Sequence, residues 1–111
     1  MNIKMLAPLL LTLLWSQAYA ADGSITISSP SNGAMVNAKD KVPVTYTAML
    51  GPNGDHLHLY VDGKRVDVLR QTKGTAELDP LPAGKHHVCL TVNTTSHAPT
   101  GVESCVDVTA Q

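Results

Sequence analysis

Phe is absent from the 111-residue sequence, and aromatic residues make up only 4% of it. A folded core must therefore be built mainly from Val, Leu, Ile and Ala. Charged residues are also few, at 15%, and the formal net charge is −1. The basic residues are scattered and lack aromatic neighbours, so no nucleic-acid partner is expected. The length suits one domain, and the 43% hydrophobic content argues against disorder.

Catalytic signatures are missing as well. The sequence has no Gly-rich phosphate loop, no Ser-His-Asp order with supporting context and no closely placed pair of carboxylates. A small sandwich domain is not expected to have a deep cleft, and it offers little to exclude water from a reaction. We therefore expect a protein that is not an enzyme.

Residues 1–20 have the pattern of a secretory signal peptide. Lys4 lies in a short basic start, residues 5–15 are apolar, and Ala18-Tyr19-Ala20 is a small-x-small cleavage pattern. The alternative is an uncleaved membrane anchor, but the apolar stretch is too short to span a bilayer comfortably. The leucine-rich form is typical of bacteria, which predicts the periplasm or the exterior as destination. Residues 21–111 would then form the mature domain, with a net charge of −2 and no membrane span.

The mature chain has the period of β-strands throughout. About seven short segments alternate apolar and polar residues, and turn signals such as Asp62-Gly63 separate them. No segment shows a sustained 3.6-residue period. We expect an all-β, immunoglobulin-like or fibronectin III-like sandwich. The predicted strands are 24–28, 42–49, 56–61, 65–69, 75–78, 86–92 and 102–108.

Two cysteines, Cys89 and Cys105, are expected to form a disulfide in an oxidising compartment. If they face each other in an antiparallel hairpin, Thr91 faces Glu103 and the midpoint is His97. Both cysteines alternate away from the Val/Leu face, so the bridge should lie on the outer face of the sheet. Closing a loop of this length adds roughly 3 kcal/mol in the chain-entropy model. The alternative is a pair of thiol metal ligands or a redox pair, although no Cys-x-x-Cys motif is present.

The histidines carry the only chemistry that the sequence offers. His56 and His58 share one face of a predicted strand, at the spacing at which two imidazoles can bind one metal ion. Antiparallel pairing with strand 86–92 brings the loop that holds His97 to the same end as His56. The predicted metal ligands are His56, His58 and His97, and Asp55 is a candidate for an added carboxylate. The alternative is that these are ordinary surface histidines.

The two remaining histidines are placed differently. His87 should share the outer face but lie toward the far end of its strand, and His86 should lie at the rim, bonded to a nearby carbonyl. Imidazole ligands suit copper, zinc and nickel. We favour copper, with zinc second. Met35 and Met49 are thioether candidates for cuprous ion, and Met49, just before the turn that leads to His56, is the better placed. The alternative role for each is core packing or turn filling.

Three segments together resemble a family of small exported bacterial proteins of unknown function, which have His-rich immunoglobulin-like domains. They are residues 54–63 (GDHLHLYVDG), 81–86 (LPAGKH) and 96–99 (SHAP). The likeness covers most of the mature chain, and the departure is the single residue that separates Pro82 from Gly84. The resemblance implies that His56, His58, His86 and His97 recur together, and it implies no established activity.

The favoured interpretation is an exported sandwich that binds copper or zinc through a histidine cluster on its surface. The rival is a structural or interaction module that docks another protein of the cell envelope through a sheet edge or its loops. That rival needs no histidine cluster. The test that separates them in a structure is whether the ring nitrogens of His56, His58 and His97 reach a common point.

Overall fold

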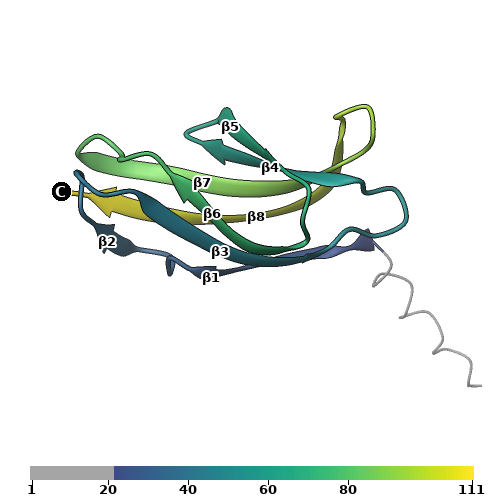
Figure 1. The fold of residues 1–111 in the computed structure, drawn as a ribbon, viewed down its shortest axis with the longest axis horizontal. Coiled ribbons are helices and arrows are strands. Elements are labelled where there is room, and N and C mark those ends of the chain that lie inside the picture. The colour runs from purple at the N-terminus through teal and green to yellow at the C-terminus, as the bar shows by residue number, and fades with distance from the viewer. Residues whose placement is uncertain (1–21) are drawn as a thin grey trace, which may run out of the picture.

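Two packed β-sheets make up the computed structural model, which describes residues 22–111 (Figure 1). The predicted signal peptide, residues 1–20, lies outside the described residues. Within residues 22–111, no helix is long and apolar enough to cross a membrane. The strands are β1 (Ser24–Ser29), β2 (Ala34–Val36), β3 (Val42–Met49), β4 (His56–Val61), β5 (Lys64–Leu69), β6 (Lys73–Leu78), β7 (Gly84–Asn93) and β8 (Pro99–Ala110).

The strands divide into a three-stranded sheet, in the order β1-β3-β6, and a five-stranded sheet, in the order β2-β8-β7-β4-β5. The long strands β7 and β8 run side by side along the molecule, and β1 and β3 lie in the layer beneath them (Figure 1). All pairings are antiparallel except the short one between β2 and β8. The predicted all-β immunoglobulin-like or fibronectin III-like sandwich is confirmed.

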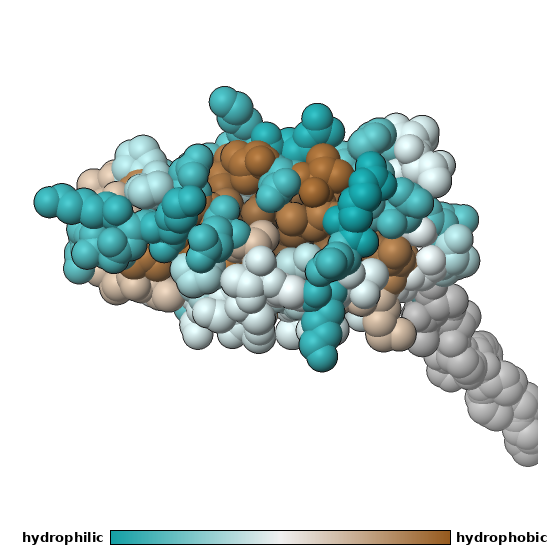
Figure 2. Space-filling model, viewed as in Figure 1, coloured by the Kyte–Doolittle hydropathy of each residue, from teal (hydrophilic) through white to brown (hydrophobic). Residues whose placement is uncertain are grey.

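Sequence alternation builds the core between the sheets. Along β3, Val42, Val44, Tyr46 and Ala48 are buried while their neighbours are not. Leucines and valines of β4 and β7 cover them from the other sheet. At the open edge between β5 and β6, apolar side chains remain visible, framed by hydrophilic ones (Figure 2). The core is therefore aliphatic, as the lack of Phe requires.

Two turns bring β4 into place. Asp62 and Gly63 both have positive φ, 52° and 83°, and join β4 to β5 as the predicted Asp-Gly hairpin. Before β4, a side chain at Gly54 would collide with the Leu50 carbonyl oxygen and with Val92. Gly54 therefore lets the chain enter β4 tightly against the five-stranded sheet.

The pairing of β7 with β8 follows the predicted register. Cys89 lies opposite Cys105 and is bonded to it as a disulfide, and Thr91 lies opposite Glu103. Nearer the loop the register shifts, because a bulge pairs Asn93 with Pro99. The predicted register placed the midpoint of the hairpin at His97. Because of the bulge, the hairpin is not symmetric about this residue.

One strand was not predicted. The three residues of β2 pair in parallel with the end of β8, Ala34 with Val108 and Val36 with Ala110. A strand of this length shows no alternation to detect, and its partner lies more than 70 residues away in the chain. Some predicted strands are also too short, since β8 runs for 12 residues from Pro99 to Ala110 rather than over residues 102–108.

Candidate metal centre

His56 and His58 lie on the outer face of the five-stranded sheet, at the start of β4. The core face of this segment is formed by Leu57 and Leu59, which are 1% exposed. His56 and His58 are nevertheless only 1% and 2% exposed themselves. The prediction of a cluster exposed on the surface is therefore wrong for two of the three histidines. The loop between β7 and β8 rises beside the start of β4 and helps to cover them (Figure 1).

That loop is a tight turn in which His97 has an unusual backbone. His97 N–H donates to the Thr94 carbonyl oxygen at 2.9 Å, and Thr94 N–H donates to the Ala98 carbonyl oxygen at 2.8 Å. His97 closes the turn with a φ of 68°, in the left-handed region that favours glycine. This conformation directs the imidazole back toward β4.

The three imidazoles meet through one ring nitrogen each. His56 Nε2 lies 3.0 Å from His58 Nε2 and 3.1 Å from His97 Nδ1, and His58 Nε2 lies 3.2 Å from His97 Nδ1. The nitrogens thus form a nearly equilateral triangle around a common point. A common point of this kind is what the predicted metal ligands His56, His58 and His97 need to share one ion.

Hydrogen bonds on the far side of two rings determine where their protons lie. His56 Nδ1–H donates to Asp55 Oδ2 at 2.8 Å, so in the neutral ring Nε2 presents a lone pair to the centre. His58 Nδ1 lies 3.3 Å from Tyr60 Oη, which accepts its hydrogen when His58 Nε2 also presents a lone pair. Lone pairs this close repel each other unless a proton or a cation lies between them.

The surroundings favour the neutral form of His58. Burial, followed by the nearby charges of His56 and Arg65, lowers the pKa of the His58 imidazole. At the edge of the site, the hydrogen bond from His56 lowers the pKa of the Asp55 carboxyl group. Arg70 also reaches the same Asp55 oxygen at 3.4 Å. Asp55 is thus held ionised, and burial favours the neutral form of the His58 imidazole, which is the form that binds a metal ion.

Asn93 positions the loop, and the sequence analysis did not identify it. It is 1% exposed, and its side-chain amide donates to the His97 carbonyl oxygen at 3.4 Å. The backbone carbonyl oxygen of Asn93 accepts a hydrogen bond from Asp55 N–H at 2.8 Å. Thr91 Oγ1–H donates to Asn93 Oδ1 at 2.5 Å and fixes the amide orientation. The register that places Asn93 opposite His56 was the available signal.

The triangle fits a small transition-metal ion. Tetrahedral zinc with nitrogen bonds of about 2.0–2.1 Å separates its ligand nitrogens by about 3.3 Å. The observed separations need to expand by only a few tenths of an ångström. The carboxylate behind His56 matches the usual outer shell, in which a carboxylate orients a ligating imidazole. Three neutral nitrogens with one open position suit zinc and copper alike.

Three other candidate ligands are not in position. Asp55 bonds the far nitrogen of His56, so its carboxylate orients a ligand rather than joining the triangle. Met49 is 65% exposed and lies on β3, in the opposite sheet. Met35 is 57% exposed and lies on β2, at the far edge of the five-stranded sheet. Neither methionine is therefore placed as a thioether ligand, and the exposure of both contradicts the alternative of a packing role in the core.

His86 and His87 lie at the other end of β7, as predicted. His86 Nδ1–H donates to Asp62 and Nε2–H to the Pro82 carbonyl oxygen, both at 2.6 Å, which confirms a rim residue bonded to a carbonyl. His87 Nδ1–H donates to Asp107 at 2.5 Å. The hydrogen bond that His86 donates to Asp62 raises the pKa of His86, and the bond that His87 donates to Asp107 raises the pKa of His87. Both imidazoles are thus stabilised in their protonated form.

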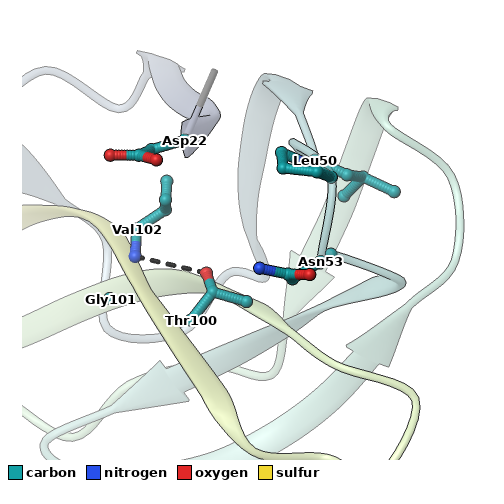
Figure 3. Close-up of a pocket in the computed structure, with 8 residues that line it drawn as sticks. Asp22, Leu50, Asn53, Thr100, Gly101 and Val102 are labelled. Carbon is teal, nitrogen blue, oxygen red and sulfur yellow. Dashed lines mark hydrogen bonds between the residues drawn. The ribbon is translucent and has the colours of Figure 1, made fainter. Parts of the chain in front are cut away.

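A separate cavity of about 260 Å³ lies between the segment that precedes β4 and the start of β8 (Figure 3). Asp22, Leu50, Asn53, Thr100 and Val102 are among its lining residues, and none of the three histidines is. The Thr100 hydroxyl is already engaged, because it donates to the Val92 carbonyl oxygen at 3.1 Å. The cavity is therefore lined by residues that take no part in the histidine cluster.

The comparisons with known proteins support the fold. No family model matches the sequence, and no curated protein matches it either. Among solved structures, the fibronectin(III)-like modules of Clostridium thermocellum CbhA superpose with a TM-score of 0.66 at 15% identity, covering 78% of this chain and 96% of the module. At this identity the likeness establishes a shared fold and nothing about function.

Two weaker likenesses have TM-scores below 0.5 and carry no argument. A Jonesia denitrificans lytic polysaccharide monooxygenase has a TM-score of 0.49 at 22% identity, and the match covers 74% of this chain and 58% of the monooxygenase. SGBP-B of the Bacteroides ovatus mixed-linkage glucan utilization locus has a TM-score of 0.48 at 16% identity, and the match covers 78% of this chain and 24% of SGBP-B. The chain is therefore similar in fold to a fibronectin III-like module, and it carries a cluster of three histidines of which two are buried.

Proposed function

We propose that this domain is an exported, non-catalytic protein that binds one transition-metal ion through His56, His58 and His97. The observation that carries the proposal is the triangle of ring nitrogens, with sides of 3.0, 3.1 and 3.2 Å. A neutral imidazole is a strong ligand, and three of them facing one another without a cation are poorly satisfied. A bound ion converts this repulsion into three coordinate bonds.

Copper is the favoured ion, with zinc second. At a given nitrogen site, divalent copper binds more tightly than zinc in the Irving–Williams order. A three-nitrogen set with an open fourth position also suits cuprous ion, which accepts low coordination numbers. Asp55 would keep the His56 ring oriented, and Asn93 would hold the His97 loop over the ion.

Export supports a site of this kind. The leader pattern in residues 1–20 and the Cys89–Cys105 disulfide are both expected of a protein of the periplasm or the exterior. The resemblance to exported His-rich immunoglobulin-like proteins agrees with this destination and brings no activity with it. We infer that the site holds its metal ion for binding or delivery rather than for chemistry.

Titration of the purified domain with cuprous, cupric and zinc ions tests the proposal. We expect one ion per chain in the disulfide-bonded protein, and tighter binding of Cu²⁺ than of Zn²⁺. Loss of an outer-shell partner weakens metal binding by up to about a hundredfold. His97 is proposed as a direct ligand, so His97→Ala should weaken binding by at least that factor. His97 is exposed, so this variant leaves the core intact.

His87→Ala is the matched control, because His87 is a histidine of the same sheet whose nitrogen is bonded to Asp107. Its affinity should equal that of the unmodified chain. Equal binding by all three proteins would overturn the metal site. It would favour the rival interpretation, an interaction module of the cell envelope.

A further inference from the structure

A second group of metal-binding atoms lies farther along the same face of the sheet. A ring nitrogen of His87 and the sulfur atoms of Cys89 and Cys105 all lie within 4.8 Å of one another. His87 and Cys89 are neighbours on the outer face of β7, and Cys105 faces Cys89 from β8. In the structure the two sulfurs form a disulfide, so they are not available as thiolate ligands.

His87 is already oriented as a metal ligand would be. Its Nδ1–H donates to Asp107 on β8 at 2.5 Å, which fixes the orientation of the ring. A metal ion that binds the other ring nitrogen displaces the proton that this nitrogen carries in the charged imidazole. The same carboxylate–imidazole arrangement holds His56 against Asp55 in the first cluster. Outer-shell carboxylates of this kind orient ligating histidines and raise their basicity.

The charge around His87 favours a cation. Asp107 is hydrogen-bonded to it, and Glu103 and Asp62 are the other carboxylates whose charge acts on the ring. Glu103, Cys105 and Asp107 alternate along the outer face of β8, so acidic groups flank the sulfur on both sides. An ion at this position would be attracted by three carboxylates.

The group is also accessible. A shallow groove of about 390 Å³ lies over it, with Tyr60, His87, Cys89 and Glu103 among its lining residues. The His87 side chain is 56% exposed. Cys89 is 7% exposed and Cys105 is half-buried, so this groove, which Cys89 lines, is the route by which a reductant and a metal ion would reach the sulfurs.

We propose that Cys89, Cys105 and His87 form a second metal site that opens when a dithiol reduces the disulfide. A thiolate of the dithiol attacks one sulfur and forms a mixed disulfide, and its second thiolate releases the protein chain. The dithiol leaves as a disulfide, and two electrons and two protons remain on the protein as two thiols. Metal binding then releases both protons, because thiolates are the ligands.

The resulting set of two thiolates and one imidazole is an established ligand set for zinc, with a fourth position left for water or for an acidic side chain. Thiolate ligands also suit cuprous ion. This site is independent of the three-histidine cluster, since the two share no residue. The oxidised protein would therefore hold one ion and the reduced protein two.

Cobalt(II) and zinc(II) are the probes, because a cobalt–thiolate bond gives a charge-transfer absorption that a cobalt–imidazole bond does not. The chain is reduced with a dithiol, freed of it under anaerobic conditions and titrated beside the oxidised protein. We expect one equivalent of cobalt in the oxidised protein. The reduced protein should bind a second equivalent, together with the thiolate absorption.

Variants separate this site from the first. Reduced Asp107→Ala should bind the second ion about tenfold to a hundredfold more weakly, the usual effect of losing an outer-shell carboxylate. Reduced His87→Ala should bind the second ion more weakly still. Reduced His97→Ala should keep the second ion and lose the first. If the first site fails but the thiolate absorption still depends on His87, the proposed function is wrong and this inference stands.

Two results would overturn the inference. One is a reduced protein that binds no more metal than the oxidised form or that binds it equally without His87. The other is loss of the β-sheet circular dichroism on reduction, because the site requires the folded register of β7 and β8. Cys89→Ser/Cys105→Ser keeps that register without thiols and should bind one ion under both conditions.

Discussion

The histidines of the five-stranded sheet lie in two regions, which differ in the groups that the imidazole nitrogens contact. At the loop end of β4 and β7, His56, His58 and His97 turn one nitrogen each toward the others, at 3.0–3.2 Å. At the other end, His86 and His87 each turn a nitrogen toward a carboxylate, Asp62 and Asp107. The side chains are the same, so their partners determine what each region can do.

Protonation follows this difference. Burial lowers the pKa of His58, whereas carboxylate partners raise those of His86 and His87. A carboxylate supplies the negative charge that an imidazolium needs, so the far region is satisfied by protons. The triangle has only Asp55, behind one ring, so the three nitrogens at its centre lack a charged partner; under the proposed function a metal cation takes that place. The number of histidines in a region is therefore less informative than the groups that their ring nitrogens contact, which are other imidazoles in one region and carboxylates in the other.

The largest expected effect separates the two regions by metal-linked stability. Free metal at about a hundred times its dissociation constant should raise the free energy of unfolding by about 2.7 kcal/mol, because the ion binds only the folded chain. His58→Ala should abolish this gain, and His86→Ala should keep it. Urea unfolding with and without metal measures both differences. An equal gain in the two variants would contradict the assignment of the ion to the triangle.

Sequence reasoning succeeded where the two-residue period and the register of strands decide the outcome. The period placed His56 and His58 on one face and the leucines on the other, and the register placed Cys89 opposite Cys105. The same register put the His97 loop at the correct end of β4. These are properties of a regular ladder, and the pattern of a few residues determines them.

Sequence reasoning failed where the outcome depends on irregular backbone. The bulge near Asn93 and the positive φ of His97 bring the loop close enough to bury His56 and His58, and neither feature has a periodic signal. The role of Asp55 depends on which side of the ring its carboxylate reaches, and that is a matter of side-chain orientation. Met49 was misplaced because nearness along the chain to His56 hides a change of sheet.

A smaller effect sharpens the comparison through pH. His86 donates to Asp62 and to Pro82, and its pKa is raised above the ordinary 6.5. This contribution to stability is complete below the unfolded-state pKa and is lost as pH rises through the folded-state pKa. The half-exposed Asp62 allows water to screen the pair, so the contribution is about 1 kcal/mol.

The quantity to measure is the difference in unfolding free energy between the unmodified chain and His86→Gln. It should be largest near about pH 5.5 and shrink toward about pH 8.5. Taking the difference cancels the opposite contribution of His58, whose lowered pKa makes the fold less stable on acidification. A difference that grows with pH would mean that His86 is held neutral and that the contrast between the two regions fails.

The smallest effect concerns the backbone of the two regions. Both contain a positive-φ residue other than glycine, Asp62 at 52° and His97 at 68°. Asp62 belongs to a tight hairpin turn that its sequence favours, whereas His97 occupies a loop position that glycine fills without strain. We expect metal-free His97→Gly to be more stable than metal-free His97→Ala by about 1 kcal/mol, because both lack the imidazole and only Ala retains the steric cost. Thermal unfolding without metal measures this difference. Equal stability would mean that the loop relaxes once the ring is gone and that the imidazole contacts, rather than the turn, hold residue 97 in the left-handed region.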